Sequence, residues 1–319
     1  MKKTLYIHIG TGKTGTTMIQ ECTKLNLDTF NNKHNFNYYP SHFYSNNYKN
    51  PDRSNLDRVD LTNKLLEELK NNINSSNLNS FLISSEFFPG EKHEEIQHIK
   101  NIFSNICDIK IIVYLRRQDE FIWSWYSQVI KTTNVNYCLD NCINRLRKAE
   151  YILDYEKFLE PWAKVFGTEN ILVNTFPPKE NLIINFFKNL DIELDLNDFK
   201  SIDRANLSLK AEQIVFIKSL LPKLDLEYAS TIVKIIQKPF DIDFNYTKSL
   251  IPPAQRKEIL NDFDKFNDNV AKKYLNRDKL FDELSIDDEE TWEYPDIIKN
   301  GYYDLATKYI QEKHEIHIN

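Results

Sequence analysis

A glycine-rich segment near the start of the chain has the residue types needed to bind phosphate. It reads, in order, Gly10-Thr11-Gly12-Lys13-Thr14-Gly15-Thr16-Thr17. Glycine lets backbone amides point at an anion with no Cβ in the way. A helix that begins here would add its N-terminal amides and its dipole. With threonine hydroxyls and one lysine beside these amides, the segment predicts a site for a phosphorylated ligand.

The spacing of this segment departs from the phosphate loop of nucleoside triphosphatases. That loop follows the pattern G-x-x-x-x-G-K-[ST]. One register requires glycine where the chain has Ile7, and the other requires lysine where the chain has Thr16. The lysine, Lys13, therefore lies in the middle of the loop instead of at its end. There it would meet a transferring group, or a bridging oxygen, beyond the bound phosphate.

The segment from Tyr6 to Thr17 resembles the 5′-phosphosulfate-binding loop of sulfotransferases, which use 3′-phosphoadenosine 5′-phosphosulfate (PAPS). The likeness is closest to bacterial members with a Lys-Thr-Gly-Thr-Thr core. The resemblance implies that Lys13 contacts the bridging oxygen and the departing phosphate, and so acts in catalysis. The residues that it implies for cofactor binding at the loop are Gly12, Lys13, Thr14, Gly15, Thr16 and Thr17.

The resemblance also implies a second anion site, for the 3′-phosphate of PAPS. The family places an arginine at the end of a later strand and a serine eight residues further on. In this chain these are Arg116 and Ser124. A guanidinium forks onto phosphate oxygens and a hydroxyl adds a neutral donor. We favour Arg116 over Arg117, which has Asp119 and Glu120 as alternative partners. The competing interpretation is that both arginines flank a strand and the serine lies on a helix surface.

A third stretch, residues 203–209, resembles the Arg-x-Asn-x-Ser segment that opens the C-terminal helical region of bacterial members. Arg204 is then a further candidate for phosphate contact. Helix capping by Asn206 or Ser208 is an equally good interpretation. The chain lacks the Arg-Lys-Gly motif of cytosolic sulfotransferases, which leaves open the residue that closes over the 3′-phosphate.

Sulfuryl transfer is an in-line displacement that needs alignment, charge neutralisation and a base. The base should lie at the C-terminal end of a strand beside the loop. Glu86 directly follows a predicted strand, and sulfotransferases use glutamate or histidine here. The alternative is that Glu86 pairs with Arg116 or Lys13 and only organises the site. Because a sulfuryl group carries less charge than a phosphoryl group, the resemblance implies no catalytic metal.

Residues that bind the acceptor are less defined by the sequence. Residues 36–48 carry several aromatic side chains among asparagine and serine, and Tyr39 and His42 are the candidates. Aromatic faces with amide and hydroxyl donors suit a sugar, and they suit a self-packed loop equally. His42 and His93 are also reserve candidates for the base.

The elements that must position these residues follow from apolar periodicity. Four apolar segments, 5–9, 80–84, 110–115 and 171–176, are predicted strands that alternate with predicted helices at 16–27, 59–73, 92–106, 118–131 and 154–166. This alternation predicts an α/β, P-loop-like three-layer fold with a central, mostly parallel sheet and helices on both faces. Residues 28–58 are expected to be irregular, and His8, in the first strand, to be a hydrogen-bonded core residue.

The last third of the chain is predicted to be mainly helical. Helices are expected at 205–222, 225–237 and 254–275. We expect a single sulfotransferase-like domain over residues 1–319, with an α/β core at 1–204. Residues 205–319 would then form a helical C-terminal part packed on that core.

Composition limits the classes of function. The 319-residue chain has a formal net charge of −6, which argues against nucleic-acid binding through a general basic surface. No stretch approaches 18 apolar residues, so we expect no membrane span. Four cysteines in a chain of this length indicate reduced thiols. With no targeting segment recognised, we expect a cytoplasmic location, where bacteria make PAPS.

The sequence supports one leading hypothesis and two alternatives. The leading one is a PAPS-dependent sulfotransferase that acts on a hydroxyl or amine of a carbohydrate or small-molecule acceptor and releases adenosine 3′,5′-bisphosphate. A divergent P-loop kinase would instead bind nucleoside triphosphate with Mg²⁺. A catalytically inactive nucleotide-binding protein is the third, and the presence of both Lys13 and Glu86 weighs against it.

Overall fold

The computed structural model divides into two compact units. The first comprises residues 1–116, 150–203 and 265–281, and the second comprises 117–149, 204–264 and 282–319. Within them the structure describes residues 2–39, 55–86, 88, 91–132, 137–149, 151–195, 197, 199–200, 209–220, 226–236, 246–282 and 292–314. The prediction of one domain over the whole chain stays a prediction.

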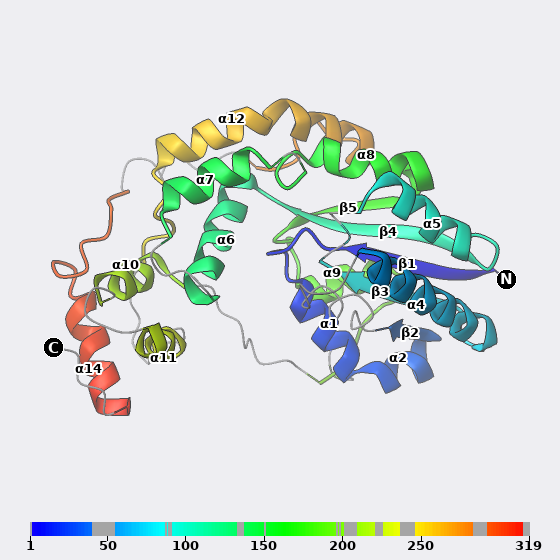
Figure 1. The fold of residues 1–319 in the computed structure, drawn as a ribbon, viewed down its shortest axis with the longest axis horizontal. Coiled ribbons are helices and arrows are strands. Elements are labelled where there is room, and N and C mark those ends of the chain that lie inside the picture. Colours follow the sequence, from blue (N-terminus) through cyan, green and yellow to red (C-terminus); the bar gives the residue numbers. More distant parts are fainter. Residues whose placement is uncertain are drawn as a thin grey trace. The chain divides into compact units, whose positions relative to one another are not determined.

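The first unit is built on a five-stranded parallel sheet (Figure 1). Its strands, in chain order, are β1 (Lys3–Ile9), β2 (Phe36–Tyr39), β3 (Ser80–Ser85), β4 (Cys107–Arg116) and β5 (Ile171–Phe176). Their order in the sheet is β2-β3-β1-β4-β5. β1 lies in the centre, where Ile7 is in register with Ile83 on one side and Ile111 on the other. Strands of near-continuous apolar character are typical of a sheet covered on both faces.

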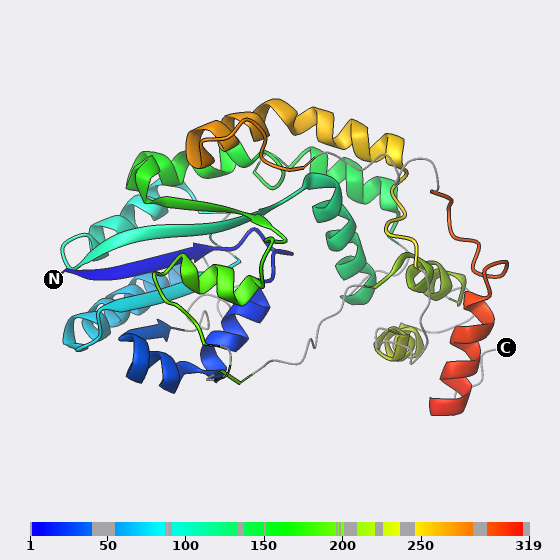
Figure 2. The same ribbon diagram turned by 180° about the vertical axis from the view of Figure 1, so that it is seen from behind.

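Helices cover both faces of this sheet, as predicted. One hydrophobic cluster joins Leu5, Ile7 and Ile9 of β1 to α4 (Asn55–Ser75), α5 (His93–Phe103) and α8 (Tyr155–Phe166). The other joins Tyr6 of the same strand to α1 (Thr16–Leu25), α2 (Leu27–His34) and α9 (Leu182–Lys188). Figure 1 shows α4 and α5 in front of the strands, and Figure 2 shows α9 in front of them from behind. Successive side chains of a strand point to opposite faces, so β1 supplies both clusters. The α/β three-layer prediction is confirmed.

The regular elements that the structure describes in the second unit are helices. Its helices are α6 (Gln118–Thr132), α7 (Leu139–Arg147), α10 (Ala211–Leu220), α11 (Leu226–Ile236), α14 (Tyr302–His314) and the first part of α12 (Pro253–Val270). α12 continues into the first unit, where a π-helical turn, η5 (Ala271–Leu275), follows it. Phe216, Ile236 and Tyr302 lie in the core cluster of the second unit. The predicted helical character after residue 205 holds for these elements.

The expectation that residues 28–58 are irregular is wrong over part of that range. The structure places α2, β2 and the start of α4 there. Only Phe30 of α2 is fully buried, so this helix has little apolar periodicity to reveal it. β2 is four residues long and buries only Phe36 and Tyr38. Helices α7, α9 and α14 were likewise not predicted.

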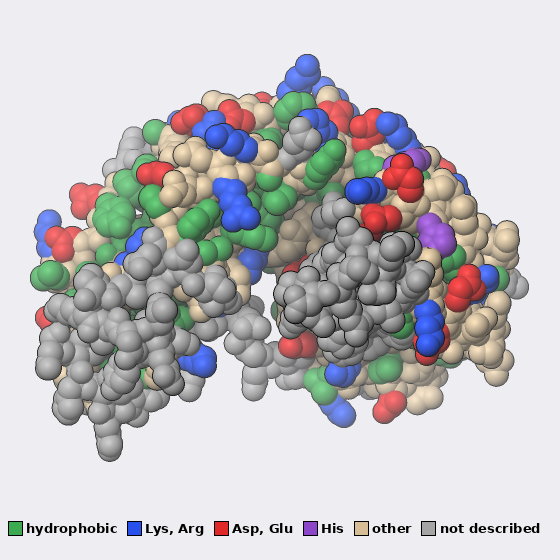
Figure 3. Space-filling view, in the orientation of Figure 1, with side chains coloured by type: hydrophobic (Ala, Val, Ile, Leu, Met, Phe, Trp, Pro, Cys, Tyr) green, Lys and Arg blue, Asp and Glu red, His purple; other side chains and the backbone are tan. Residues whose placement is uncertain are grey.

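The described residues carry charges of both signs on the surface. Figure 3 shows basic and acidic side chains interspersed where its visible face is described. None of the described helices combines the length and the apolar character needed to cross a bilayer.

Candidate active site

The glycine-rich segment forms a tight loop between β1 and α1. Gly12, Lys13 and Gly15 have positive φ angles of 70°, 55° and 82°. Gly15 also occupies the N-cap position of α1. A Cβ added to Gly15 would lie 2.3 Å from Leu182 Cδ2, so glycine is needed both for this backbone angle and for the close approach of α9. The loop therefore ends directly at the N-terminus of a helix.

Two buried threonine hydroxyls in this loop lack hydrogen-bond partners. Thr14 is 0% and Thr16 is 1% exposed, and neither Oγ1 makes a hydrogen bond in the described structure. Buried polar groups are normally satisfied, because leaving one unmade costs about 1–3 kcal/mol. The loop is also open: a Cβ added to the buried Gly12 would meet no atom within 4 Å. These features fit a phosphate, which would accept hydrogen bonds from both hydroxyls at the helix N-terminus.

The loop is held against β4 by two contacts. Thr11 Oγ1 donates a hydrogen bond to the Tyr114 carbonyl at 2.9 Å. Arg116, the last residue of β4, donates from its guanidinium to the Lys13 carbonyl at 3.0 Å. That bond takes one of the five N–H donors of a guanidinium, so it is compatible with an anion contact by the same side chain.

Arg116 is itself fixed by neighbouring aromatic residues. Its guanidinium lies 5.3 Å from the centre of the Phe176 ring at the end of β5. The Tyr155 hydroxyl, in the first turn of α8, donates to the Arg116 carbonyl. The predicted position of Arg116 at a strand end is confirmed, whereas neither aromatic partner was predicted. No local sequence pattern marks Phe176 as a partner of Arg116, because the two residues meet only through the pairing of β4 with β5.

Glu86 lies on the other side of the loop, directly after β3. Ile9 of β1 is in register with Ser85, and the Gly10 amide donates to the Ser85 carbonyl at 3.1 Å. The Glu86 side chain is exposed, and its Cγ would lie 3.4 Å from a Cβ added to Gly10. Glu86 therefore borders the loop, as a base at the end of a neighbouring strand requires.

The charge of Lys13 depends on both flanking residues. Burial lowers the pKa of Lys13 below its usual value. The Glu86 carboxylate opposes this shift and the Arg116 guanidinium adds to it. The structure thus brings together Lys13, Glu86 and Arg116 from three adjacent strand ends, where the strand order reverses around β1. Ligands of open parallel sheets bind at such a point.

Arg117 differs from its neighbour Arg116. Its Nε lies 2.8 Å from Asp119 Oδ1, and its Nη2 lies 3.2 Å from Glu120 Oε1. Asp119, which is 0% exposed at its side chain, also pairs with Arg256 at 2.7 Å. Both predicted alternative partners of Arg117 are therefore confirmed, which supports the choice of Arg116 as the candidate ligand.

Other predicted site residues have different outcomes. Ser124 lies within α6, as expected, and is buried, but it belongs to the second unit and its ligand role stays a prediction. Tyr39 ends β2, two strands from β1, and its ring stacks on Phe81 at 6.3 Å. Burial raises the Tyr39 pKa, and its acceptor role stays a prediction. Arg204 and His42 lie outside the described residues.

The buried side chains below the loop form a small polar network. His8 Nδ1 lies 2.8 Å from Ser84 Oγ, and Gln20 donates to the Ser84 carbonyl at 3.1 Å. Burial lowers the pKa of His8 to about 3, so the imidazole is neutral near pH 7. The prediction that His8 is a hydrogen-bonded core residue is confirmed.

Among the described residues, no group of three or more His, Cys, Asp or Glu side chains is placed to hold a metal ion. The expectation that catalysis needs no metal stays a prediction, because it concerns the reaction. Lys13, the amides of the loop and Arg116 are groups at this edge of the sheet that could bind an anion.

Comparisons with known proteins give distant likenesses. No family model matches the sequence. An uncharacterized protein from Archaeoglobus fulgidus is 25% identical over 242 residues, and the match covers 73% of this chain and 63% of that protein. The crystal structure of a sulfotransferase from Alicyclobacillus acidocaldarius is similar with a TM-score of 0.40 and 11% identity, over 73% of this chain and 96% of that one. Likenesses with identities and a TM-score this low do not establish a function for this chain.

Proposed function

We propose that this protein is a sulfotransferase, which transfers a sulfuryl group from PAPS to a hydroxyl or amine of a carbohydrate or small-molecule acceptor. One observation carries the proposal. A loop at the carboxyl edge of the sheet holds a lysine in its middle and two buried, unpartnered threonine hydroxyls. A carboxylate and a guanidinium flank it on the two adjacent strands. The proposal includes a cytoplasmic location, where bacteria make PAPS.

The loop residues are suited to bind the 5′-phosphate of the donor. The hydroxyls of Thr14 and Thr16 would gain the hydrogen-bond acceptor that they lack. The amides of residues 13–17 adjoin the N-terminus of α1, where the helix dipole favours negative charge. The space in front of Gly12 leaves the backbone accessible to an anion.

The flanking residues supply the chemistry. Lys13 neutralises the negative charge that develops on the leaving phosphate as the bond between sulfur and the bridging oxygen breaks. Glu86 accepts the proton of the acceptor hydroxyl or amine as its oxygen or nitrogen bonds to sulfur. The exposed position of the Glu86 side chain leaves it accessible to an acceptor. Bound PAPS supplies the activated sulfuryl group for this displacement.

Arg116 has two functions in this proposal. It braces the loop through the Lys13 carbonyl, and its guanidinium adds positive charge that attracts the 3′-phosphate of the donor. The proposed contacts of Ser124 and Arg204 with the same phosphate rest on the sequence resemblance alone. Loss of Arg116 would therefore weaken donor binding and also disturb the position of Lys13.

An assay with radiolabelled PAPS tests this function. The full chain is incubated with labelled donor and a panel of saccharides and small hydroxylated or amine acceptors. We expect label in at least one acceptor for the wild type, and transfer about 10²–10³-fold slower for Lys13→Ala. Glu86→Gln should lose about 10²–10⁴-fold in rate, the usual contribution of a general base. Full activity of Glu86→Gln would move the base to another residue, and transfer by Lys13→Ala at the wild-type rate would refute the assignment of the loop.

A further inference from the structure

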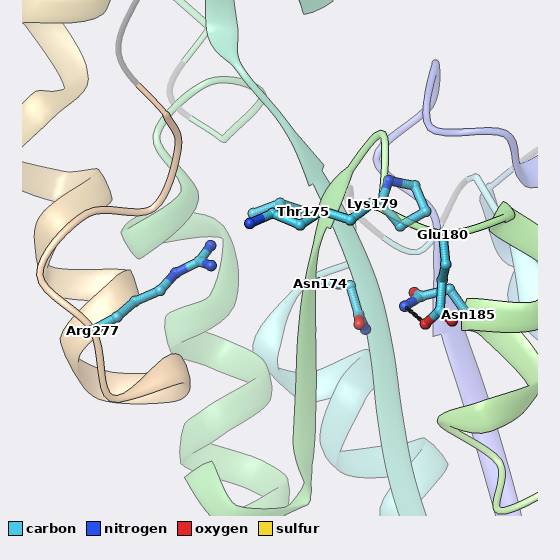
Figure 4. Close-up of a pocket in the computed structure, with 7 residues that line it drawn as sticks. Asn174, Thr175, Lys179, Glu180, Asn185 and Arg277 are labelled. Carbon is cyan, nitrogen blue, oxygen red and sulfur yellow. Dashed lines mark hydrogen bonds between the residues drawn. The ribbon is translucent and has the colours of Figure 1, made fainter.

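A second polar pocket lies beside β5, at the edge of the sheet. It has a volume of about 450 Å³ and is lined in part by Asn174 and Thr175 of that strand (Figure 4). Small-molecule sites in proteins typically have volumes of this size. β5 is the last strand in the sheet order, and an edge strand presents backbone groups outside the ladder. The pocket thus places polar side chains beside an edge strand.

Two cations approach each other across this pocket. Lys179 follows β5, and Arg277 follows the η5 turn. Figure 4 shows the Lys179 ammonium and the Arg277 guanidinium extending toward the same space. Neither forms an ion pair with a carboxylate among the residues that the structure describes. Two like charges that face each other are unfavourable, and an anion between them would reverse the sign of the interaction.

The carboxylate of Glu180 is close to the pocket but interacts with other residues. Glu180 also lines the pocket, but its Oε1 accepts a hydrogen bond from Asn185 Nδ2 at 2.9 Å and lies 4.0 Å from Lys188 Nζ. Figure 4 shows this pair on the opposite side of β5 from Arg277. The space between Lys179 and Arg277 therefore keeps a positive charge.

Arg277 is held in place before any ligand binds. Its Nη2 donates to the Leu280 carbonyl at 2.6 Å, and its backbone amide donates to the Ala271 carbonyl at 3.4 Å. Pro177 and Pro178 precede Lys179 and restrict the backbone there, because proline fixes its own φ. Preorganised donors lose less entropy on binding.

We propose that this pocket binds the oxyanion group, a sulfate or a carboxylate, of an acidic saccharide. A guanidinium and an ammonium match such a group, and the Thr175 hydroxyl suits a sugar hydroxyl. Thr175 immediately precedes Phe176, whose ring contacts Arg116, so the pocket lies at the same end of the sheet as the loop. That the saccharide is the acceptor rests on the sulfotransferase function proposed above.

Calorimetric titration of the full chain with defined probes tests the pocket. The probes are galactose 6-sulfate, glucuronate, inorganic sulfate and uncharged galactose. We expect galactose 6-sulfate and glucuronate to bind about tenfold more tightly than galactose, as one charge-assisted contact provides. Equal affinity for inorganic sulfate and galactose 6-sulfate would reduce the pocket to a site for free anions and overturn the saccharide assignment.

Single substitutions assign this binding to the two cations. Arg277→Gln and Lys179→Gln should each weaken galactose 6-sulfate about tenfold. Lys24→Gln, which removes an exposed lysine in the last turn of α1, should leave the affinity unchanged and controls for net charge. Wild-type affinity in both pocket variants would refute the proposal.

A parallel titration separates the pocket from the donor site. Arg277→Gln should bind adenosine 3′,5′-bisphosphate within about twofold of the wild type, and galactose 6-sulfate should bind Lys13→Ala as it binds the wild type. If Arg277→Gln lost nucleotide affinity, the pocket would belong to the donor and the proposal would fail. Failure of the wild type to bind the nucleotide would instead refute the sulfotransferase function, while the sugar titration still reports on the pocket.

Discussion

Arg116 and Arg117 are neighbours in the sequence, yet the polar groups around them are organised in opposite ways. Arg117 belongs to a cluster in which the buried Asp119 carboxylate pairs with the guanidiniums of both Arg117 and Arg256. Arg116 belongs to the loop region, in which two buried threonine hydroxyls have no partner. One region satisfies its buried polar groups internally, and the other keeps two buried hydroxyls without a hydrogen-bond partner.

This difference separates a structural role from a binding role. Buried polar groups are expensive unless they are hydrogen-bonded, so a fully paired cluster stabilises one conformation and needs no ligand. An unsatisfied pair at a helix N-terminus lowers stability and gains from an anion. Substitutions in the first region should therefore change the free energy of unfolding, and those in the second should change ligand binding and catalysis.

The largest expected effect on folding comes from the paired region. Asp119→Ala leaves Arg117 and Arg256 facing each other without their common carboxylate. We expect a loss of about 3–5 kcal/mol in the free energy of unfolding, as for other broken buried ion pairs. Urea unfolding followed by circular dichroism measures it. Glu258→Gln, in the exposed pair with Arg147, is the matched control and should cost about 0–1 kcal/mol. Equal losses in the free energy of unfolding for Asp119→Ala and Glu258→Gln would contradict the claim that the buried cluster stabilises the fold more than an exposed ion pair.

Lys13→Ala should lower the transfer rate without lowering the stability of the fold. The loss of one positive group at the leaving phosphate should lower kcat about 10²–10³-fold. Stability should not fall, because burial already disfavours the charged form of Lys13. Transfer rates and urea midpoints are compared with those of Lys24→Ala, which should match the wild type in both. A Lys13→Ala protein that is strongly destabilised but fully active would invert this interpretation of the loop.

The threonines of α1 offer the sharpest contrast within one helix. Thr16→Val removes a buried hydroxyl that has no partner, so the unliganded protein should gain about 1 kcal/mol. Its affinity for adenosine 3′,5′-bisphosphate should fall about tenfold. Thr23→Val removes a buried hydroxyl that donates to the Ile19 carbonyl at 2.6 Å, and should lower stability while leaving nucleotide affinity intact. Identical behaviour of the two valine variants would contradict the account.

His8 contributes an effect that appears only as a pH dependence, and its direction follows from its pKa. Its pKa is about 3 in the folded protein and 6.5 when exposed, so below pH 6.5 the unfolded chain binds a proton that the folded one does not. Stability contributed by the neutral imidazole is present above pH 6.5 and is lost as the pH falls. We expect about 1.4 kcal/mol less stability at pH 5.5 than at pH 7.5 from this group. His8→Gln should remove this part of the dependence of the free energy of unfolding on pH. If the slope of that dependence were the same in the variant and the wild type, His8 would have to be protonated in the folded state.

Much of this architecture could be predicted because the strands are strongly apolar. β1, β3, β4 and β5 appear as short buried runs, and the glycines between β1 and α1 mark a turn that only a few residue types allow. α2 and β2 escaped prediction because they are short and bury few side chains. Their stability comes from packing, such as Phe30 stacked on Phe187 at 4.3 Å, which no local pattern reveals.

In the candidate site, too, some residues could be predicted from the sequence and others could not. Lys13, Glu86 and Arg116 could be predicted because each lies at or shortly after a strand end, and parallel strand ends meet at one edge of a sheet. Tyr155 and Phe176, which fix Arg116, could not be assigned this role because their contacts depend on how α8 and β5 pack. Whether a buried hydroxyl has a partner is also a property of the folded chain alone.

Thermal unfolding with added nucleotide tests the central claim most directly. A ligand at a hundred times its dissociation constant stabilises the folded state by about 2.7 kcal/mol. We predict that adenosine 3′,5′-bisphosphate raises the melting temperature of the wild type without Mg²⁺, raises it less in Thr16→Val, and that ATP has little effect. Stabilisation by ATP with Mg²⁺ and none by adenosine 3′,5′-bisphosphate would contradict the sulfotransferase assignment.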